Sequence, residues 1–208
     1  SECEVHDIGD GVLCFEFTSK SNSIGEGIGK GLYEIIEIAE QGDWNGLVIG
    51  NNAKQLSVGA NLMNIGMLAM QKQYEVLDKF VSDFQKINMR IRTSKIPVVV
   101  ATQGYVFGGG CEISMHCDAG IYAAESYIGL VEVGVGLLPG GGGTKEFALR
   151  ASNDFFDGDV QTPTLIRYFK SIATAAVSTS AHEAYDLGYL NRERDFVSVN
   201  APMNLILA

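Results

Sequence analysis

Two glutamates stand in settings that suit proton transfer. Glu112 follows three consecutive glycines in "GYVFGGGCEISMHCD", residues 104–118, and Glu132 lies between two valines in "YIGLVEVGVGLLPGGGG", residues 127–143. A carboxylate in an apolar run must be paired, hydrogen-bonded or held with a perturbed pKa. Two such groups could form an acid/base pair. Each could instead cap backbone N–H groups or meet an arginine, and on the residues alone this structural use is the ordinary one for two such glutamates.

Glycines mark two turns at which an anion could bind. Gly108, Gly109 and Gly110 lie between an expected strand and an expected helix, whose first N–H groups have no partners inside the helix. In "SVGANLMNI", Gly59 precedes a second helix start that we expect at Ala60. The two sets of amides could converge on one oxygen and stabilise its negative charge. Glycine-rich turns also serve close packing alone, so both interpretations stay open at this point.

Cysteine and histidine spacing gives no metal signal. The four cysteines form no CxxC pair and have no histidines at metal-ligand spacing: Cys3, Cys14, Cys111 and Cys117. We therefore expect structural thiols and no metal site. His6 and His182 lie in polar contexts near the ends of the chain and are expected to face solvent. His116 comes four residues after Glu112 and could share its helix face.

The elements that must position these residues alternate between strand and helix patterns. Apolar runs bounded by turn residues predict strands at 11–17, 44–52, 95–104 and 119–124. Helical spacing predicts helices at 28–39, 74–92 and 166–176, with a polar stretch at 152–165 and a short final helix that ends at Gly188. This alternation predicts an α/β fold with parallel strand pairing.

Length and charge narrow the class of protein. A chain of 208 residues with 46% apolar and 19% charged residues suits one domain with a substantial core. The 25 acidic and 15 basic side chains give a net charge of −10, which repels nucleic acid and anionic membranes. The sequence has no apolar run of membrane-spanning length and no signal-peptide pattern. We therefore expect a cytoplasmic protein with no nucleic-acid or membrane partner.

Four stretches, in their order and spacing, resemble the crotonase superfamily of enoyl-CoA hydratases and isomerases. They are "LSVGANL", "GYVFGGGCEISMHCD", "VEVGVGLLPGGGGTK" and "STSAHEAYDLGYLN". The longer agreement is similar to the crotonase part of bifunctional 3-hydroxyacyl-CoA dehydrogenase/enoyl-CoA hydratases. The resemblance implies a spiral of repeated ββα units, with a crotonase core at 1–200 and the start of a truncated C-terminal helical region at 201–208.

The same resemblance implies that the chain is a fragment of a larger enzyme. No GxGxxG fingerprint follows a strand here, so we expect NAD to bind only in a dehydrogenase part outside this chain. We expect no cofactor in this chain itself, because CoA is part of the substrate. In the family, C-terminal helices cover the acyl pocket and support trimers, so a homo-oligomer, a trimer, is expected.

The implied reaction is hydration of a 2-enoyl-CoA in fatty-acid β-oxidation. The amides of Ala60 and Gly109 would hold the thioester oxygen, and Glu112 and Glu132 would hold a water between them. One glutamate would accept a proton as the water attacks C3, and the other, by family analogy Glu132, would protonate C2 of an enolate. The substrate-binding residues expected by the same analogy are Leu56, Val58, Asn61, Leu62 and Gly140.

Two departures from the family and three alternatives bear on this reading. Asn61 stands where the family often has Asp, and Val131 stands where it often has Pro. Δ3-Δ2 isomerisation, the alternative reaction, needs only one well-placed carboxylate. A non-catalytic acyl-CoA-binding module would need no acid/base pair. A Rossmann module would carry its glycines in the first βα unit, whereas here they fall in mid-chain.

Overall fold

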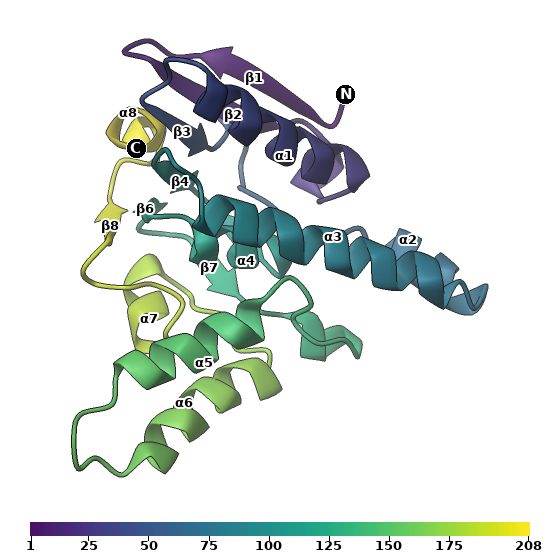
Figure 1. Ribbon diagram of the computed structural model, residues 1–208. Helices are drawn as coiled ribbons and strands as arrows, with labels where there is room; N and C mark the ends of the chain where they lie inside the picture. Colours follow the sequence, from purple (N-terminus) through teal and green to yellow (C-terminus); the bar gives the residue numbers. More distant parts are fainter.

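A six-stranded sheet forms the centre of the molecule. The computed structural model describes residues 1–208, and the strand order is β1-β2-β3-β4-β6-β8 (Figure 1). Only β1 is antiparallel to its neighbour, and all the other pairs are parallel, as the alternation of elements predicted. The strands are β1 (Cys3–Asp7), β2 (Val12–Phe17), β3 (Gly46–Ile49), β4 (Val98–Thr102), β6 (Ala119–Ala123) and β8 (Asp195–Ser198).

A small second sheet lies beside the first. It consists of β5 (Tyr105–Phe107) and β7 (Tyr127–Gly129), which pair in parallel. An isolated bridge joins Ser57 to Val106 at its edge. This arrangement brings the end of the segment after β3 next to the segment that leads into the three glycines.

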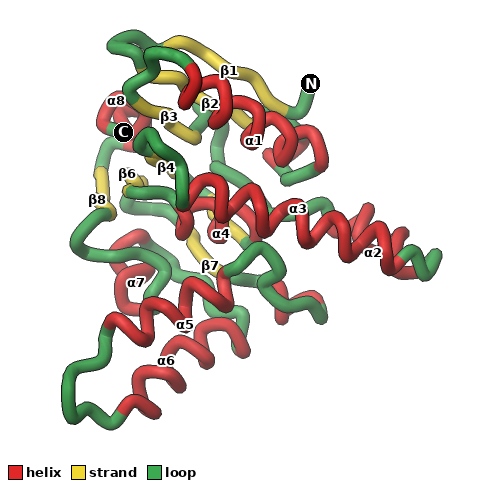
Figure 2. Tube along the Cα trace, in the orientation of Figure 1, coloured by secondary structure: helices red, strands yellow, loops and turns green.

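Helices cover the sheets and form two projecting pairs. The helices are α1 (Glu26–Gln41), α2 (Leu62–Met70), α3 (Tyr74–Arg92), α4 (Gly109–His116), α5 (Gly143–Asn153), α6 (Gln161–Ala173), α7 (Ala181–Asp186) and α8 (Asn204–Leu207). Three short 3-10 turns are η1 (Lys20–Asn22), η2 (Glu132–Val135) and η3 (Ala201–Met203). In Figure 2, α2 and α3 lie together at one side, and α5 and α6 lie together at the other.

The repeated ββα unit can be followed in the order of these elements. In β4-β5-α4 and in β6-β7-α5, the first strand joins the large sheet and the second joins the small one. Each unit then ends in a helix that starts from a glycine-rich turn. The predicted α/β fold with a crotonase-type spiral is therefore confirmed, and the same repetition places the starts of α4 and α5 close together.

The core explains why the predicted helices and strands form. A cluster of 31 buried apolar residues fills the space between the sheet and the helices. The apolar stripe of α1 faces this cluster, and its buried members recur at helical spacing: Ile28, Leu32, Ile35, Ile36 and Ala39. All four residues of β3 are buried, as expected of a parallel strand covered on both faces. The bounds of α3 coincide with the predicted helix at 74–92.

Two helix starts differ from the prediction. α2 begins at Leu62 rather than Ala60, because the side chain of Asn61 accepts hydrogen bonds from the amides of Met63 and Asn64 at 3.2 and 3.4 Å and caps the helix. α6 begins at Gln161, inside the stretch that we expected to be polar loop. Pro163 is tolerated there because the first turn of a helix does not use its N–H groups.

The sequence patterns did not reveal β1, β5, β7 or β8. Each has only three to five residues, and β1 is mostly exposed, so neither apolar alternation nor a buried run was visible. Residues 201–208 form η3 and α8. Helix α8 packs against β4 and β6, and the Asn204 Nδ2 donates to the Thr102 carbonyl at 2.7 Å. The proposed boundary at residue 200 stays a prediction. None of the helices has the length and apolar character needed to cross a lipid bilayer.

Candidate active site

The three-glycine turn lies at the buried N-terminus of α4. Gly108 has φ +51°, a conformation that favours glycine, and its N–H donates to the Gly129 carbonyl at 2.9 Å. A Cβ atom at Gly108 would lie 3.1 Å from Oε1 of Glu132. The turn therefore needs glycine both for its backbone and to leave room for a carboxylate.

The second glycine turn meets the first. Gly59 has φ +88°, and a Cβ atom there would lie 2.9 Å from the Phe107 carbonyl oxygen and 3.4 Å from the Gly109 nitrogen. The amide of Ala60 donates to no acceptor in the chain, and Gly109, as the first residue of α4, has no acceptor within the helix. Two free N–H groups thus belong to backbone segments that are in contact, which is the arrangement needed for an oxyanion hole.

Glu112 is held by backbone amides. Its side chain is 2% exposed, and Oε1 accepts from the Gly143 amide at 2.9 Å. Burial, and then the charge of Glu132, raise the pKa of Glu112 to about 7, while hydrogen bonds from the amides of Gly143, Gly141 and Gly142 act in the opposite direction. Glu112 therefore does cap the start of α5, and it also titrates near neutral pH.

Glu132 has far fewer partners. It begins η2, and its Oε2 is buried without a hydrogen-bond partner in the chain. Burial raises the pKa of Glu132 to about 6. No arginine pairs with either glutamate. A buried carboxylate oxygen without a partner is costly, and such groups are typical of sites that bind or react.

The two glutamates, twenty residues apart in sequence, lie near each other, Glu112 against the amides of Gly141–Gly143 and Glu132 beside Gly108. The charge of Glu132 acts on the pKa of Glu112, and Gly108, which precedes α4, lies beside the Glu132 carboxylate. With pKa values of about 7 and about 6, the pair holds a single proton over the interval between them. One carboxyl can then donate a proton while the other accepts one.

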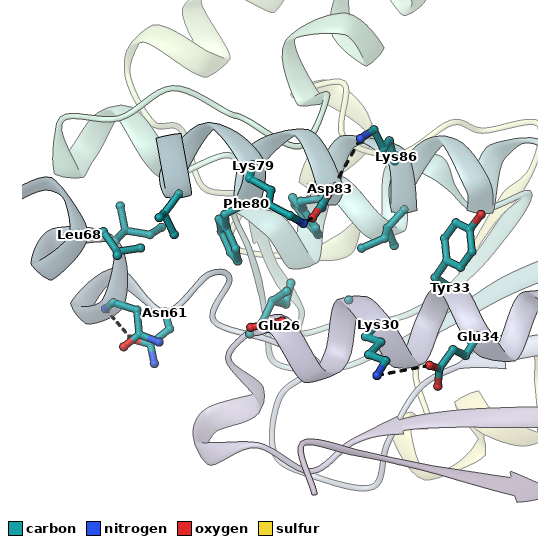
Figure 3. A pocket seen from close by; sticks show the side chains of 18 of the residues that line it. Glu26, Lys30, Tyr33, Glu34, Asn61, Leu68, Lys79, Phe80, Asp83 and Lys86 are labelled. Atoms are coloured by element: carbon teal, nitrogen blue, oxygen red, sulfur yellow. Dashed lines mark hydrogen bonds and ion pairs between the residues drawn. The ribbon is translucent and has the colours of Figure 1, made fainter. Parts of the chain in front are cut away.

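A cleft lies beside the turn that holds Gly59 and Ala60, with Asn61 in its lining. It has a volume of about 740 Å³ and is bordered by α1, α2 and α3 (Figure 3). Its apolar lining includes Ile65, Leu68, Phe80 and Ile87, and ion pairs between Lys30 and Glu34 and between Lys79 and Asp83 lie at its rim. Neither Glu112 nor Glu132 lines it.

Two residues of the cleft connect it to the site. A Cβ atom at Gly109 would lie 3.1 Å from both Ile24 Cδ1 and Phe84 Cζ, and both side chains line the cleft. Phe84 also borders Gly141, where a Cβ atom would lie 2.5 Å from Oε2 of Glu112. The sequence analysis gave neither Phe84 nor Ile24 a role at the site, because apolar spacing does not say what a side chain touches.

The expected substrate-binding residues fall into different places. The Leu56 side chain is fully buried, and its N–H and C=O bond to Gln103 and Asn51. Val58 and Leu62 are exposed, and Asn61 lines the cleft. Gly140 is half-buried.

The Gly140–Gly143 loop is fixed from α3. The Gly140 carbonyl accepts from Gln85 Nε2 at 2.7 Å, and the Gly141 carbonyl accepts from Asn88 Nδ2 at 2.8 Å. Sequence reasoning missed both Gln85 and Asn88. Contacts of any expected residue with a substrate stay a prediction.

The remaining histidines and cysteines lie as expected. His6 and His182 are exposed, and three of the four cysteines are buried. Glu4, His6 and Glu16 are close enough to share an ion, but they lie on the exposed β1–β2 hairpin, and none of them borders the residues described above.

A family model matches most of the chain. Residues 7–157 match the model described as enoyl-CoA hydratase/isomerase, and this range includes both glycine turns and both glutamates.

Curated relatives carry related names. The chain is 42% identical over 197 residues to the "Probable 3-hydroxyacyl-CoA dehydrogenase" of Bacillus subtilis, covering 93% of this chain and 24% of that protein. It is 29% identical over 148 residues to the crotonyl-CoA hydratase of Syntrophomonas wolfei, covering 70% of this chain and 50% of that protein. The chain thus spans about a quarter of the Bacillus relative.

Solved structures share the fold. An enoyl-CoA hydratase from Polaromonas sp. JS666 superposes with a TM-score of 0.81 at 22% identity, covering 99% of this chain and 74% of that one. An enoyl-CoA hydratase from Thermoplasma volcanium superposes with a TM-score of 0.76, also at 22% identity, covering 99% and 75%. At this identity the likeness establishes the fold and no more.

Proposed function

Because the chain belongs to the enoyl-CoA hydratase/isomerase family, we propose that it adds water across the 2,3 double bond of 2-enoyl-CoA thioesters. One observation carries the proposal. Two carboxyls with raised pKa values lie near the backbone segments that carry the free amides of Ala60 and Gly109: Glu112, which is buried, and Glu132, which is half-buried with one buried oxygen. Hydration needs this set: two fixed donors for a carbonyl oxygen and a pair of carboxyls that share one proton.

The chain's groups would act in a defined order. The amides of Ala60 and Gly109 bind the thioester oxygen and draw electrons from C3. As the water oxygen bonds to C3, one carboxylate takes a proton from the water, and the double-bond electrons move to form an enolate. The other carboxyl then gives its proton to C2, so the pair ends with one proton, as it began. The amides stabilise the enolate more than the substrate, which is what lowers the barrier.

The proton has a preferred place before substrate binds. Burial and the charge of Glu132 favour the protonated form of Glu112 in the free protein. Family analogy gives the C2 donor role to Glu132. On that assignment the proton passes from Glu112 to Glu132 before water adds.

Isomerisation is the alternative reaction in this family. Moving a double bond needs one carboxyl that removes and returns a proton. Two neighbouring carboxyls with pKa values of about 7 and about 6 favour hydration instead.

We further propose that the chain is the hydratase part of a longer bifunctional enzyme. The Bacillus relative, of which the chain covers 24%, carries the name of a dehydrogenase. NAD would then bind in another part of that protein. A trimeric assembly is part of the same proposal, and light scattering at micromolar concentration tests it, since a monomer would refute it.

A direct assay tests the function. Purified chain is mixed with crotonyl-CoA, with a long-chain 2-enoyl-CoA and with a 3-enoyl-CoA, and products are separated by chromatography. We expect 3-hydroxyacyl-CoA from the first two substrates and its loss in Glu132→Gln. Conversion of the 3-enoyl-CoA alone would establish the isomerase instead, and binding without any turnover would indicate a non-catalytic acyl-CoA module.

A further inference from the structure

His116 is a buried titratable group that the proposed mechanism does not use. It ends α4, one turn after Glu112, and is 1% exposed. Its Nδ1 lies 2.6 Å from the backbone carbonyl oxygen of Glu112, and its Nε2 lies 2.9 Å from Nζ of Lys145. The imidazole therefore joins α4 to the first turn of α5.

The chemistry of its two partners fixes the tautomer. A carbonyl oxygen can only accept, so Nδ1 of His116 carries the hydrogen. Nε2 then offers a lone pair to the Lys145 ammonium. Burial lowers the pKa of His116 to about 4, which keeps the ring neutral at physiological pH. Protonation would remove the acceptor and place a cation beside Lys145.

Two further charged side chains, Glu146 and Arg92, surround the contact between His116 and Lys145. Glu146, on α5, accepts from Lys145 Nζ at 2.6 Å and from Arg92 of α3 at 2.5 Å. Arg92 also donates to the Met115 carbonyl on α4 at 2.7 Å. The charges that face His116 are thus those of Lys145, Glu146 and Arg92, and they tie α3, α4 and α5 together.

His116 and Lys145 both lie next to the backbone amides that bind Glu112. A Cβ atom at Gly142 would lie 3.1 Å from Cε1 of His116, so the ring packs directly on that backbone. Gly143 follows and donates to Glu112 Oε1, and Lys145 comes two residues later on the same turn. Any shift of the ring or of Lys145 would move the amides relative to the carboxylate.

We propose that His116 is a positioning residue, which acts through Lys145 to hold the amides of Gly141–Gly143 against the carboxylate of Glu112. Its catalytic importance rests on the proposed function of Glu112. Amides that point at a carboxylate favour the charged form. Loosening them therefore raises the pKa of Glu112, so that the group acts as a base only at higher pH, and misplaces it for proton transfer.

Two variants break the link at its two ends. His116→Leu removes the ring nitrogens without changing net charge, and Lys145→Met removes the ammonium at a partly exposed position. The pKa of Glu112 is measured by infrared titration, as the difference between each variant and the same variant carrying Glu112→Gln. We expect both variants to raise this pKa by about half a unit or more.

Activity gives the second readout. In both variants the acid limb of kcat/KM should move to higher pH by the same amount, and kcat should fall about tenfold with KM nearly unchanged. His116→Gln, which keeps an oxygen acceptor for Lys145, should recover part of the loss. The matched controls are Cys117→Ala, a truncation of the next buried side chain, and Lys170→Met, which removes an exposed lysine from α6. Both controls should leave the pKa and the pH profile unchanged.

Two results separate this inference from the proposed function. If His116→Leu and Lys145→Met lower thermal stability but leave the pKa of Glu112 at the wild-type value, the positioning role is refuted. The infrared titration needs no turnover. A shifted pKa in a protein that hydrates no enoyl-CoA would refute the proposed function while retaining the structural link.

Discussion

The surroundings of Glu112 and Glu132 differ although the two residues are chemically identical. Glu112 lies on a fully buried helix, and its carboxylate meets three successive amides of the α5 N-terminus. Glu132 lies on a 3-10 turn, with one oxygen beside Gly108 and the other without a partner. Burial raises the pKa of both. One carboxyl is thus fixed by the protein, while the other keeps hydrogen-bonding capacity that a ligand or water could use.

The largest effect is expected when either carboxyl is removed. Glu112→Gln and Glu132→Gln keep the side-chain size but cannot exchange a proton, so each should reduce hydratase turnover by about a hundredfold or more. Acyl-CoA binding, measured by calorimetry, should largely survive. Glu125→Gln, at an exposed position, is the control. Near-normal turnover in either active-site variant would take that residue out of the mechanism.

A smaller effect is expected when Glu132 is only displaced. Gly108→Ala places a methyl group 3.1 Å from Glu132 Oε1 at φ +51°, so we expect turnover to fall about tenfold and stability to fall by about 1 kcal/mol. Gly158→Ala also places a methyl group at a glycine of positive φ, +91°, but with no neighbour within 4 Å. Steady-state kinetics and urea unfolding compare the two. Equal turnover in both variants would show that Gly108 serves the backbone alone.

The raised pKa values also predict how stability changes with pH. Between the ordinary carboxyl pKa of 4.5 and the folded values of about 6 and about 7, the folded protein binds more protons than the unfolded chain. Stability contributed by this pair is therefore full below the ordinary pKa and is lost as pH rises through the folded values. Urea unfolding at about pH 5 and about pH 7.5 should show a decline that is smaller, by about 1 kcal/mol or more, in the Glu112→Gln/Glu132→Gln double variant.

Glu40 should contribute a pH dependence of stability in the opposite direction. Hydrogen bonds from Arg90, and one from the Lys95 amide, lower the pKa of Glu40 to about 2. Its contribution is present above the ordinary carboxyl pKa and is lost as pH falls toward 2. A decline above pH 5 that persists in the double variant would assign the effect to other groups.

The smallest effect is expected at Asn61, which follows Ala60 and caps α2. Asn61→Asp keeps an oxygen acceptor for the amides of Met63 and Asn64. The equilibrium constant of unfolding and the turnover rate should therefore each change by less than about twofold. Asn61→Ala loses the cap, so the free energy of unfolding should fall by about 1 kcal/mol. A large loss of activity in Asn61→Asp would give this side chain a direct role in the reaction.

Local sequence patterns were enough to predict much of the fold and to identify the candidate active-site residues. The helix at 74–92 was predicted with its observed bounds because an apolar stripe is a local property. Glu112, Glu132 and the two glycine turns stood out because charge and flexibility interrupt apolar runs. The short strands β5 and β7 were missed, since three residues carry too little pattern, although these strands hold the glycine turn in place.

The types of the residues and their order along the chain were enough to identify the candidates for catalysis and the family pattern that they follow. Only the tertiary structure decided that Glu132 lies beside Gly108, that Phe84 and Ile24 touch Gly109, and that His116 reaches Lys145. Periodicity says which face of an element is buried but not which partner it meets. Contacts between distant segments depend on how the whole core packs, and the pKa values of the two glutamates depend on those contacts.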